Sequence, residues 1–154
     1  MELAEKLKEV LGIIESLETV YLSTIDQNGY PSTRAMLNLR NKKQYPHLVP
    51  MYAKESNEFT IYLTTNTSSA KIKEIENNNK AALYFCKPES FTGIMFQGNI
   101  QVVTSKEFKH NAWMKGWELY YPGGVESEDF AMLRFVPFSF KTYSDFQVQT
   151  EKID

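Results

Sequence analysis

Residues 61–80, IYLTTNTSSAKIKEIENNNK, join a hydrophobic strand to a helix through a run of small hydrogen-bonding side chains. The segment IYLT has the composition of a strand, and after Ser69 the apolar residues Ile72 and Ile75 recur at helical spacing. The first turn of a helix carries unpaired backbone N–H groups and partial positive charge, so an anion is stabilised there. Because Lys71 adds a full positive charge, this junction indicates a site for a phosphate group.

Several side chains of this junction can donate hydrogen bonds to a phosphate: Thr64, Thr65, Asn66, Ser68, Ser69 and Lys71. The alternative is a serine at the start of a helix, beside a surface lysine, with no ligand at all. The sequence contains no glycine-rich Walker pattern, so a nucleoside triphosphate is a poor candidate.

The preceding hairpin contributes a second cation. VYLSTI at 20–25 leads into the turn sequence DQNG, after which STRAMLNL at 32–39 resumes as a strand. Arg34 lies in the middle of this second strand, among small and apolar residues. A phosphate or carboxylate suits its planar guanidinium. An outward-facing side chain or a structural ion pair is the alternative.

The remaining patterns predict a mainly β fold. Residues 3–17 carry apolar side chains at intervals of three and four, which predicts an amphipathic lid helix. Residues 40–58 contain two prolines and polar clusters, which predict a loop around a short strand. A helix is expected from Ser105, and a long strand at 92–104 is expected to bend or bulge at its glycines, Gly93 and Gly98.

About six strands, few helices and short turns describe a small antiparallel barrel, formed as a single domain over residues 1–154. FAMLRFVPFSFKTYSDF near the end of the chain supplies one or two closing strands. The net charge of −2 is scattered, so no basic face indicates a nucleic-acid partner. No stretch reaches the length of a membrane span and the start of the chain lacks a signal-peptide pattern, so we expect a cytoplasmic protein.

Other reactive side chains have structural explanations. His47 lies in a predicted loop and His110 in a predicted helix, and neither has an evident acid–base partner. Cys86 closes an apolar strand and is expected to be a buried small residue. Trp113 and Trp117 are four residues apart, which places them on one helical face for packing in the core or at a dimer interface.

Taken in order, the segments TIDQNGYPSTRAMLNL, FTIYLTTNTSSAKIKEIENNNKAALYF, GNIQVV and WMKGWELYYPGGVESEDFAMLRFVP resemble the pyridoxamine 5'-phosphate oxidase-like family of flavin-binding split barrels, in its short general-stress-protein branch. The resemblance implies a six-stranded Greek-key split barrel and a homodimer with FMN at the subunit interface. It also assigns cofactor-binding residues: Arg34, Ala35, Met36, Leu37, Thr64, Thr65, Ser69 and Lys71. Ala70 stands where the family pattern has an arginine, which leaves the site one cation short.

The resemblance further implies an FMN-dependent oxidoreductase that passes electrons or hydride to a small substrate, which remains unidentified. Pyridoxamine phosphate oxidases proper carry arginine and histidine in a C-terminal substrate segment, whereas this chain ends in SDFQVQTEKID, so we do not expect vitamin B6 chemistry. A noncatalytic flavin-binding sensor or storage protein is one alternative. The other is a barrel that has lost flavin and serves as an interaction module.

Overall fold

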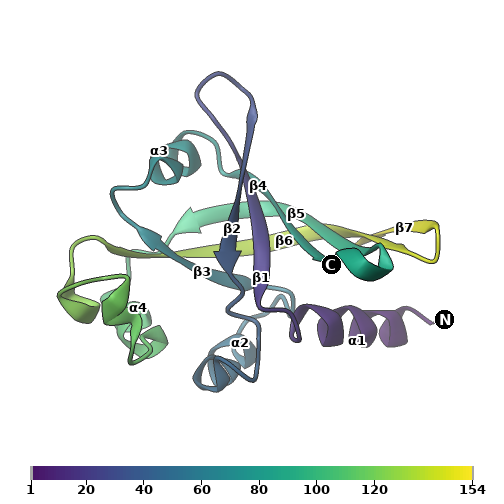
Figure 1. Cartoon of the computed structure of the whole chain (residues 1–154), viewed down its shortest axis with the longest axis horizontal. Helices are drawn as coiled ribbons and strands as arrows, with labels where there is room; N and C mark the ends of the chain where they lie inside the picture. The colour runs from purple at the N-terminus through teal and green to yellow at the C-terminus, as the bar shows by residue number, and fades with distance from the viewer. Residues whose placement is uncertain (1, 154) are drawn as a thin grey trace.

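The computed structural model describes residues 2–153 and consists of one antiparallel sheet curled around a hydrophobic core, with short helices at its edges (Figure 1). Its strands are β1 (Thr19–Ile25), β2 (Pro31–Leu37), β3 (Ile61–Asn66), β4 (Lys80–Lys87), β5 (Thr92–Val102), β6 (Phe130–Ser144) and β7 (Gln147–Lys152). Its helices are α1 (Leu3–Ile14), α2 (Val49–Ala53), α3 (Ala70–Asn77) and α4 (Lys106–Ala112). Four 3-10 turns lie at Pro46–Leu48, Pro88–Ser90, Trp117–Leu119 and Gly124–Glu126.

The strand order confirms the predicted split-barrel architecture. Six strands follow one another in the order β2-β1-β4-β5-β6-β3, and every pairing is antiparallel. Because β3 pairs with β6 at one edge while β4 lies in the middle, the segment that contains α3 must cross over between them. A seventh strand, β7, follows β6 directly and pairs with it as an antiparallel hairpin. The sequence patterns did not predict this strand. None of the helices within residues 2–153 is long and apolar enough to cross a membrane.

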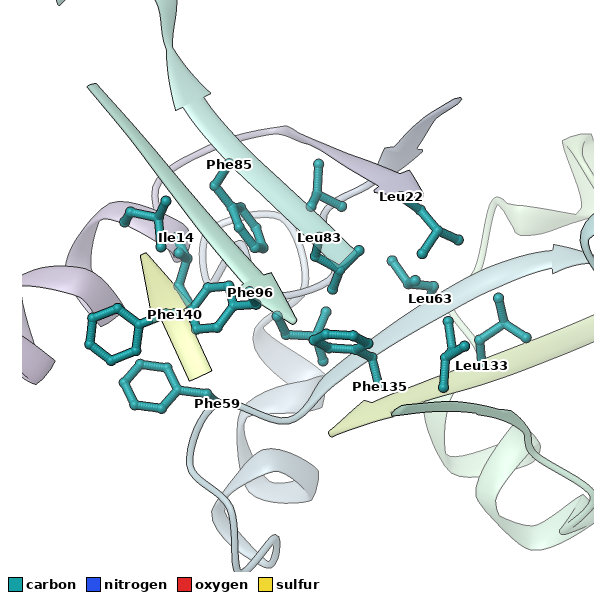
Figure 2. Packing of buried hydrophobic residues seen from close by; sticks show 14 of the residues in the cluster. Ile14, Leu22, Phe59, Leu63, Leu83, Phe85, Phe96, Leu133, Phe135 and Phe140 are labelled. Carbon is teal, nitrogen blue, oxygen red and sulfur yellow. The ribbon is translucent and has the colours of Figure 1, made fainter. Parts of the chain in front are cut away.

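The main core lies inside the curl of the sheet. Five phenylalanines from β4, β5, β6 and the segment before β3 pack together there, as Figure 2 shows: Phe59, Phe85, Phe96, Phe135 and Phe140. Burying each such side chain stabilises the fold by about 1.5–3 kcal/mol. The predicted N-terminal helix, α1, packs on this core through Val10 and Ile14. It ends at Ile14, earlier than the sequence pattern indicated.

A second apolar cluster lies on the other face of β3, beneath α2 and α4. Its aromatic members include Tyr52, Tyr62, Trp117 and Phe130. Residues on both faces of β3 are therefore buried, so packing on both sides holds this strand in place. This double burial gives the start of α3 a rigid support.

The prediction of a short strand within residues 40–58 was wrong, because this segment forms a 3-10 turn and α2 instead. Pro46 and Pro50 occupy the first turns of these helices. Proline is tolerated there because the first N–H groups of a helix have no intrahelical partner. The two prolines therefore marked helix starts.

The prediction that Trp113 and Trp117 share one helical face was also wrong. Ser105 caps α4 by accepting a hydrogen bond from the N–H of Phe108 at 3.1 Å, but the helix ends at Ala112. Gly116 then adopts a φ of 107°, which turns the chain away from helical geometry. The two indole rings still meet edge to face, with centroids 5.8 Å apart.

The two glycines of β5 have different roles. The register between β5 and β6 shifts at Gly98, which confirms a bulge there. The pairing of β4 with β5 continues without a shift at Gly93, so of the expected bend or bulge, a bulge does not form at that residue. A Cβ on Gly93 would lie 2.2 Å from the Tyr84 hydroxyl, so this glycine makes room for a side chain of the adjacent strand.

Candidate functional site

The end of β3 and the start of α3 bring together three of the predicted phosphate-binding side chains. Ser69 caps α3, and its hydroxyl accepts a hydrogen bond from the Lys71 N–H at 3.4 Å. The Lys71 ammonium donates to the hydroxyl oxygens of Thr65, at 2.8 Å, and Ser69, at 2.6 Å. Both hydroxyl groups keep their own protons for donation to another acceptor.

Lys71 is half-buried and forms no ion pair with any carboxylate of residues 2–153. Burial lowers the pKa of its ammonium, and the nearby positive charge of Arg34 lowers it further. The first effect is loss of water around the charge and the second is repulsion between like charges, and the Glu74 carboxylate offsets them in part. A bound anion would relieve this cost.

Arg34 reaches the same place from β2. Its Nη1 donates to the Thr24 hydroxyl at 2.7 Å, and its Nη2 lies 3.2 Å from Glu74 Oε2. Thr24 in turn donates to the same carboxylate oxygen at 2.6 Å. The structural ion pair that was the alternative for Arg34 is therefore present in this structure.

We call the group formed by Arg34, Thr65, Ser69, Lys71 and Glu74 the phosphate cradle, after the role predicted for this junction. The two cations and one carboxylate give it a net charge of +1, to which the N-terminus of α3 adds a partial positive charge. Sequence reasoning did not assign Glu74 to the site. The available signal was its spacing from Lys71, because residues three apart on a helix lie on the same side.

The other residues assigned by the resemblance do not join the phosphate cradle. Ala35 and Leu37 are exposed on the outer face of the sheet, whereas Met36 points inward against the core. Thr64 alternates with Thr65 along β3 and lies near Tyr121, on the opposite face. Successive side chains of a strand point to opposite faces of the sheet, so residues that are adjacent in the sequence of β2 or β3 do not share one site.

Asn66 and Ser68 were expected to offer donors to a phosphate, but both are bonded to Asp129. The Asn66 amide donates to Asp129 Oδ2 at 2.7 Å, and the Ser68 N–H donates to Oδ1 at 2.9 Å. The hydrogen bond from the Ser68 N–H lowers the pKa of Asp129 most strongly, followed by that from Asn66. These contacts fasten the β3–α3 connection to the segment before β6.

Neither histidine lies in the cradle. The His47 ring nitrogen contacts the carbonyl oxygen of Ala112 at 3.0 Å, and His110 pairs with Glu126 at the surface. Cys86 is unpaired and half-buried. Within residues 2–153, no three His, Cys, Asp or Glu side chains group so that they could hold a metal ion.

Comparison with known proteins identifies a family to which this chain is similar. The family model described as "Pyridoxamine 5'-phosphate oxidase like" matches residues 7–143. A pyridoxine/pyridoxamine 5'-phosphate oxidase of Legionella pneumophila is 30% identical over 86 residues, which are 56% of this chain. The match spans only 33% of the length of that relative.

Solved structures agree with this match. A protein related to general stress protein 26 of B. subtilis, from Clostridium acetobutylicum, superimposes with a TM-score of 0.80 and 31% identity, over 97% of this chain and 96% of the other. A pyridoxamine 5'-phosphate oxidase-related, FMN-binding protein from Nostoc punctiforme superimposes with a TM-score of 0.59 and 15% identity, over 97% and 95% of the two chains. The second similarity, at this low identity, concerns the fold alone.

Proposed function

Since the chain belongs to the pyridoxamine 5'-phosphate oxidase-like family, we propose that it binds FMN, with the phosphate held in the phosphate cradle, and acts as an oxidoreductase on a small substrate. The observation that carries this proposal is Lys71, a half-buried cation beside Arg34 that contacts hydroxyl groups and no carboxylate of residues 2–153. A fixed anion at this point would pair with both cations.

The donor set of the cradle fits a phosphate monoester. The hydroxyls of Thr65 and Ser69 would donate to its oxygens, while the Lys71 ammonium supplies charge and Arg34 supplies a planar pair of donors. FMN would supply the redox chemistry, since a flavin ring accepts and passes on hydride or single electrons. The chain's own contribution is then to hold and orient the cofactor.

We further propose a homodimer with the flavin at the subunit interface, in the cytoplasm. Support for the dimer comes from the outer face of β1, β2 and β4, where large apolar side chains are exposed: Tyr21, Leu37 and Tyr84. Register places Tyr21 opposite both Ala35 and Tyr84, so these exposed residues form one continuous patch. The unpaired Cys86 is consistent with a reducing compartment.

The proposal is tested by visible absorption of the purified protein, before and after FMN is added and the excess removed by gel filtration. A retained flavin band is expected, followed by bleaching of that band with NADH or NADPH and recovery on adding an electron acceptor. Protein that stays colourless at saturating FMN would refute the cofactor assignment. Light scattering of the same gel-filtration peak tests the dimer.

A second candidate is a split barrel that no longer uses flavin for turnover, as a noncatalytic flavin-binding protein or an interaction module. Two observations favour it: Ala70 replaces the family arginine, and Arg34 is already paired with Glu74. Retained FMN without turnover under any reductant would support the noncatalytic form. Loss of FMN binding altogether would support the interaction module.

A further inference from the structure

A separate pocket begins where β2 ends, between α1, α2 and the segment that joins β2 to α2. In Figure 1, α1 and α2 lie below the sheet and α3, which carries the cradle, lies above it. The pocket has a volume of about 250 Å³. Its walls are largely apolar and aromatic, and are formed by Leu11, Leu39, Tyr45, Val49, Tyr52 and Ala53.

Most of the charged groups around this pocket neutralise one another. Glu15 lies 2.7 Å from the Lys42 ammonium, and Glu55 is held by two hydrogen bonds from Arg134. The side chain of Glu58 is exposed at the rim. Of the charged residues that line the pocket, Arg40 and Glu58 form no ion pair with any described residue, so Arg40 is the one unpaired cation in its wall.

The Arg40 side chain is enclosed but incompletely bonded. Only 7% of the residue is exposed, and it forms no ion pair within residues 2–153. One of its terminal nitrogens donates to the carbonyl oxygen of Glu58, whereas its Nε is buried with no hydrogen-bond partner among the described residues. The guanidinium stacks on Tyr52, with its carbon 4.2 Å from the ring centroid.

A buried guanidinium without a counterion is energetically costly, so its position calls for an explanation. Burial lowers the pKa of Arg40, which reflects this cost. Stacking on Tyr52 offsets part of it, since a cation is attracted to the face of an aromatic ring. A carboxylate would offset more, because its two oxygens match the donor pairs at the edge of the guanidinium.

We propose that this pocket is a binding site for a small aromatic carboxylate, with Arg40 as the partner of the carboxylate and the tyrosine-lined wall as the partner of the ring. Arg40, the one unpaired cation in the wall, would pair with a monoanion, whereas the Glu58 carboxylate lies exposed at the rim. Size is consistent with a single ring, because an apolar cavity of about 150 Å³ already accommodates benzene. The site does not depend on FMN binding, since none of the cradle residues lines it.

The test uses fluorine NMR of 4-fluorobenzoate with the full-length protein, in the absence of FMN. Saturable binding is expected for the wild type, with at least tenfold weaker binding for Arg40→Met. Lys54→Met is the matched control, because it removes one exposed positive charge from the same region without lining the pocket. The control variant should bind as the wild type does.

Arg40→Met could disturb folding, so a second variant leaves the arginine in place. Ala53 lines the pocket from the exposed end of α2, and Ala53→Phe should fill the space and abolish binding while the melting temperature is unchanged. Equal binding of the neutral 4-fluorobenzamide, retained binding in Arg40→Met, or no saturable binding by the wild type would each overturn the proposal. A failed FMN titration would not, since this assay contains no FMN.

Discussion

Within the phosphate cradle, Arg34 interacts with both Glu74 and Lys71: its Nη2 lies 3.2 Å from Glu74 Oε2, and its positive charge lowers the pKa of Lys71. Thr24 bonds to both members of the pair and holds them in register. Glu74 therefore orients Arg34 but also subtracts a charge from the site that an anion would occupy.

Replacing Glu74 should strengthen phosphate binding. In Glu74→Gln the hydrogen bonds to Arg34 and Thr24 can persist, whereas the negative charge is lost, so we expect FMN to bind about 1 kcal/mol more tightly. Isothermal titration with FMN measures the change. Glu76→Gln, an exposed site on the same helix, should leave affinity unaltered. Weaker binding in Glu74→Gln would mean that orientation of Arg34 outweighs charge.

Removing the Lys71 ammonium should weaken FMN binding by about 1–3 kcal/mol, because a charge-assisted hydrogen bond to the phosphate is lost. Lys71→Ala is compared with Lys73→Ala, which removes an exposed charge two residues away. Flavin fluorescence titration gives both dissociation constants. Equal affinities in the two variants would place the phosphate elsewhere. Arg34→Ala should resemble Lys71→Ala in affinity and stay folded by circular dichroism.

Restoring the family arginine should improve retention of the cofactor. Ala70 is exposed at the first turn of α3, so Ala70→Arg adds a cation beside the cradle without disturbing the core. We expect FMN affinity to rise by about 1–2 kcal/mol, and to rise less at high salt, since exposed charges are screened. Ala70→Gln is the control for side-chain length. An increase that is equal in the two variants would point to contacts other than charge.

The ion pair of Glu55 with Arg134 should make stability depend on pH. Hydrogen bonding from Arg134 lowers the pKa of Glu55 below its usual value, and the Tyr62 hydroxyl donates to the same carboxylate at 2.7 Å. Glu55→Gln should reduce the free energy of unfolding at pH 7 by about 1–3 kcal/mol.

The sign of this pH effect follows from the direction of the pKa shift. The folded-state pKa is the lower one, so the stabilisation is complete above the unfolded value of about 4.3 and disappears as pH falls through the folded value. Urea unfolding of wild type and Glu55→Gln should therefore converge in acid. The control is Glu58→Gln, whose side chain is exposed. Its difference in stability from the wild type should not shrink as the pH falls. If the free energies of unfolding of the wild type and Glu55→Gln differ by the same amount at pH 7 and pH 3, the stabilising role of the Glu55 charge would be contradicted.

Two glycines should respond oppositely to alanine. A Cβ on Gly98 would lie 2.3 Å from the Val136 carbonyl oxygen, so Gly98→Ala must shift the backbone at the β5 bulge and should cost about 1–3 kcal/mol. Gly12 lies inside α1, where a Cβ would meet no atom within 4 Å, so Gly12→Ala should stabilise by about 0.5–1 kcal/mol. Thermal unfolding shows whether each variant is more or less stable than the wild type. A stabilised Gly98→Ala variant would show that the bulge tolerates a side chain.

Local patterns in the sequence were sufficient for most of the fold. Alternation, the DQNG turn and the apolar spacing of α1 and α3 identified the main strands and helices, because these features depend on residues near in sequence. They failed for residues 40–58, where the two prolines begin short helices and do not flank a strand. They also failed for Trp113, because the helix ends before it and Gly116 adopts a positive φ. The hairpin strand β7 is polar along most of its length, so no hydrophobic pattern marked it.

The sequence by itself determined the chemical character of the candidate site: a helix start capped by Ser69, a lysine two residues later, and an arginine inside a strand. Only the tertiary structure decided which side chains meet. It turned Thr64 away from Thr65, bonded Asn66 and Ser68 to Asp129, and placed Glu74 on Arg34. These outcomes depend on strand alternation and on pairings between segments distant in the chain, where packing of the whole sheet fixes distances that no local pattern contains.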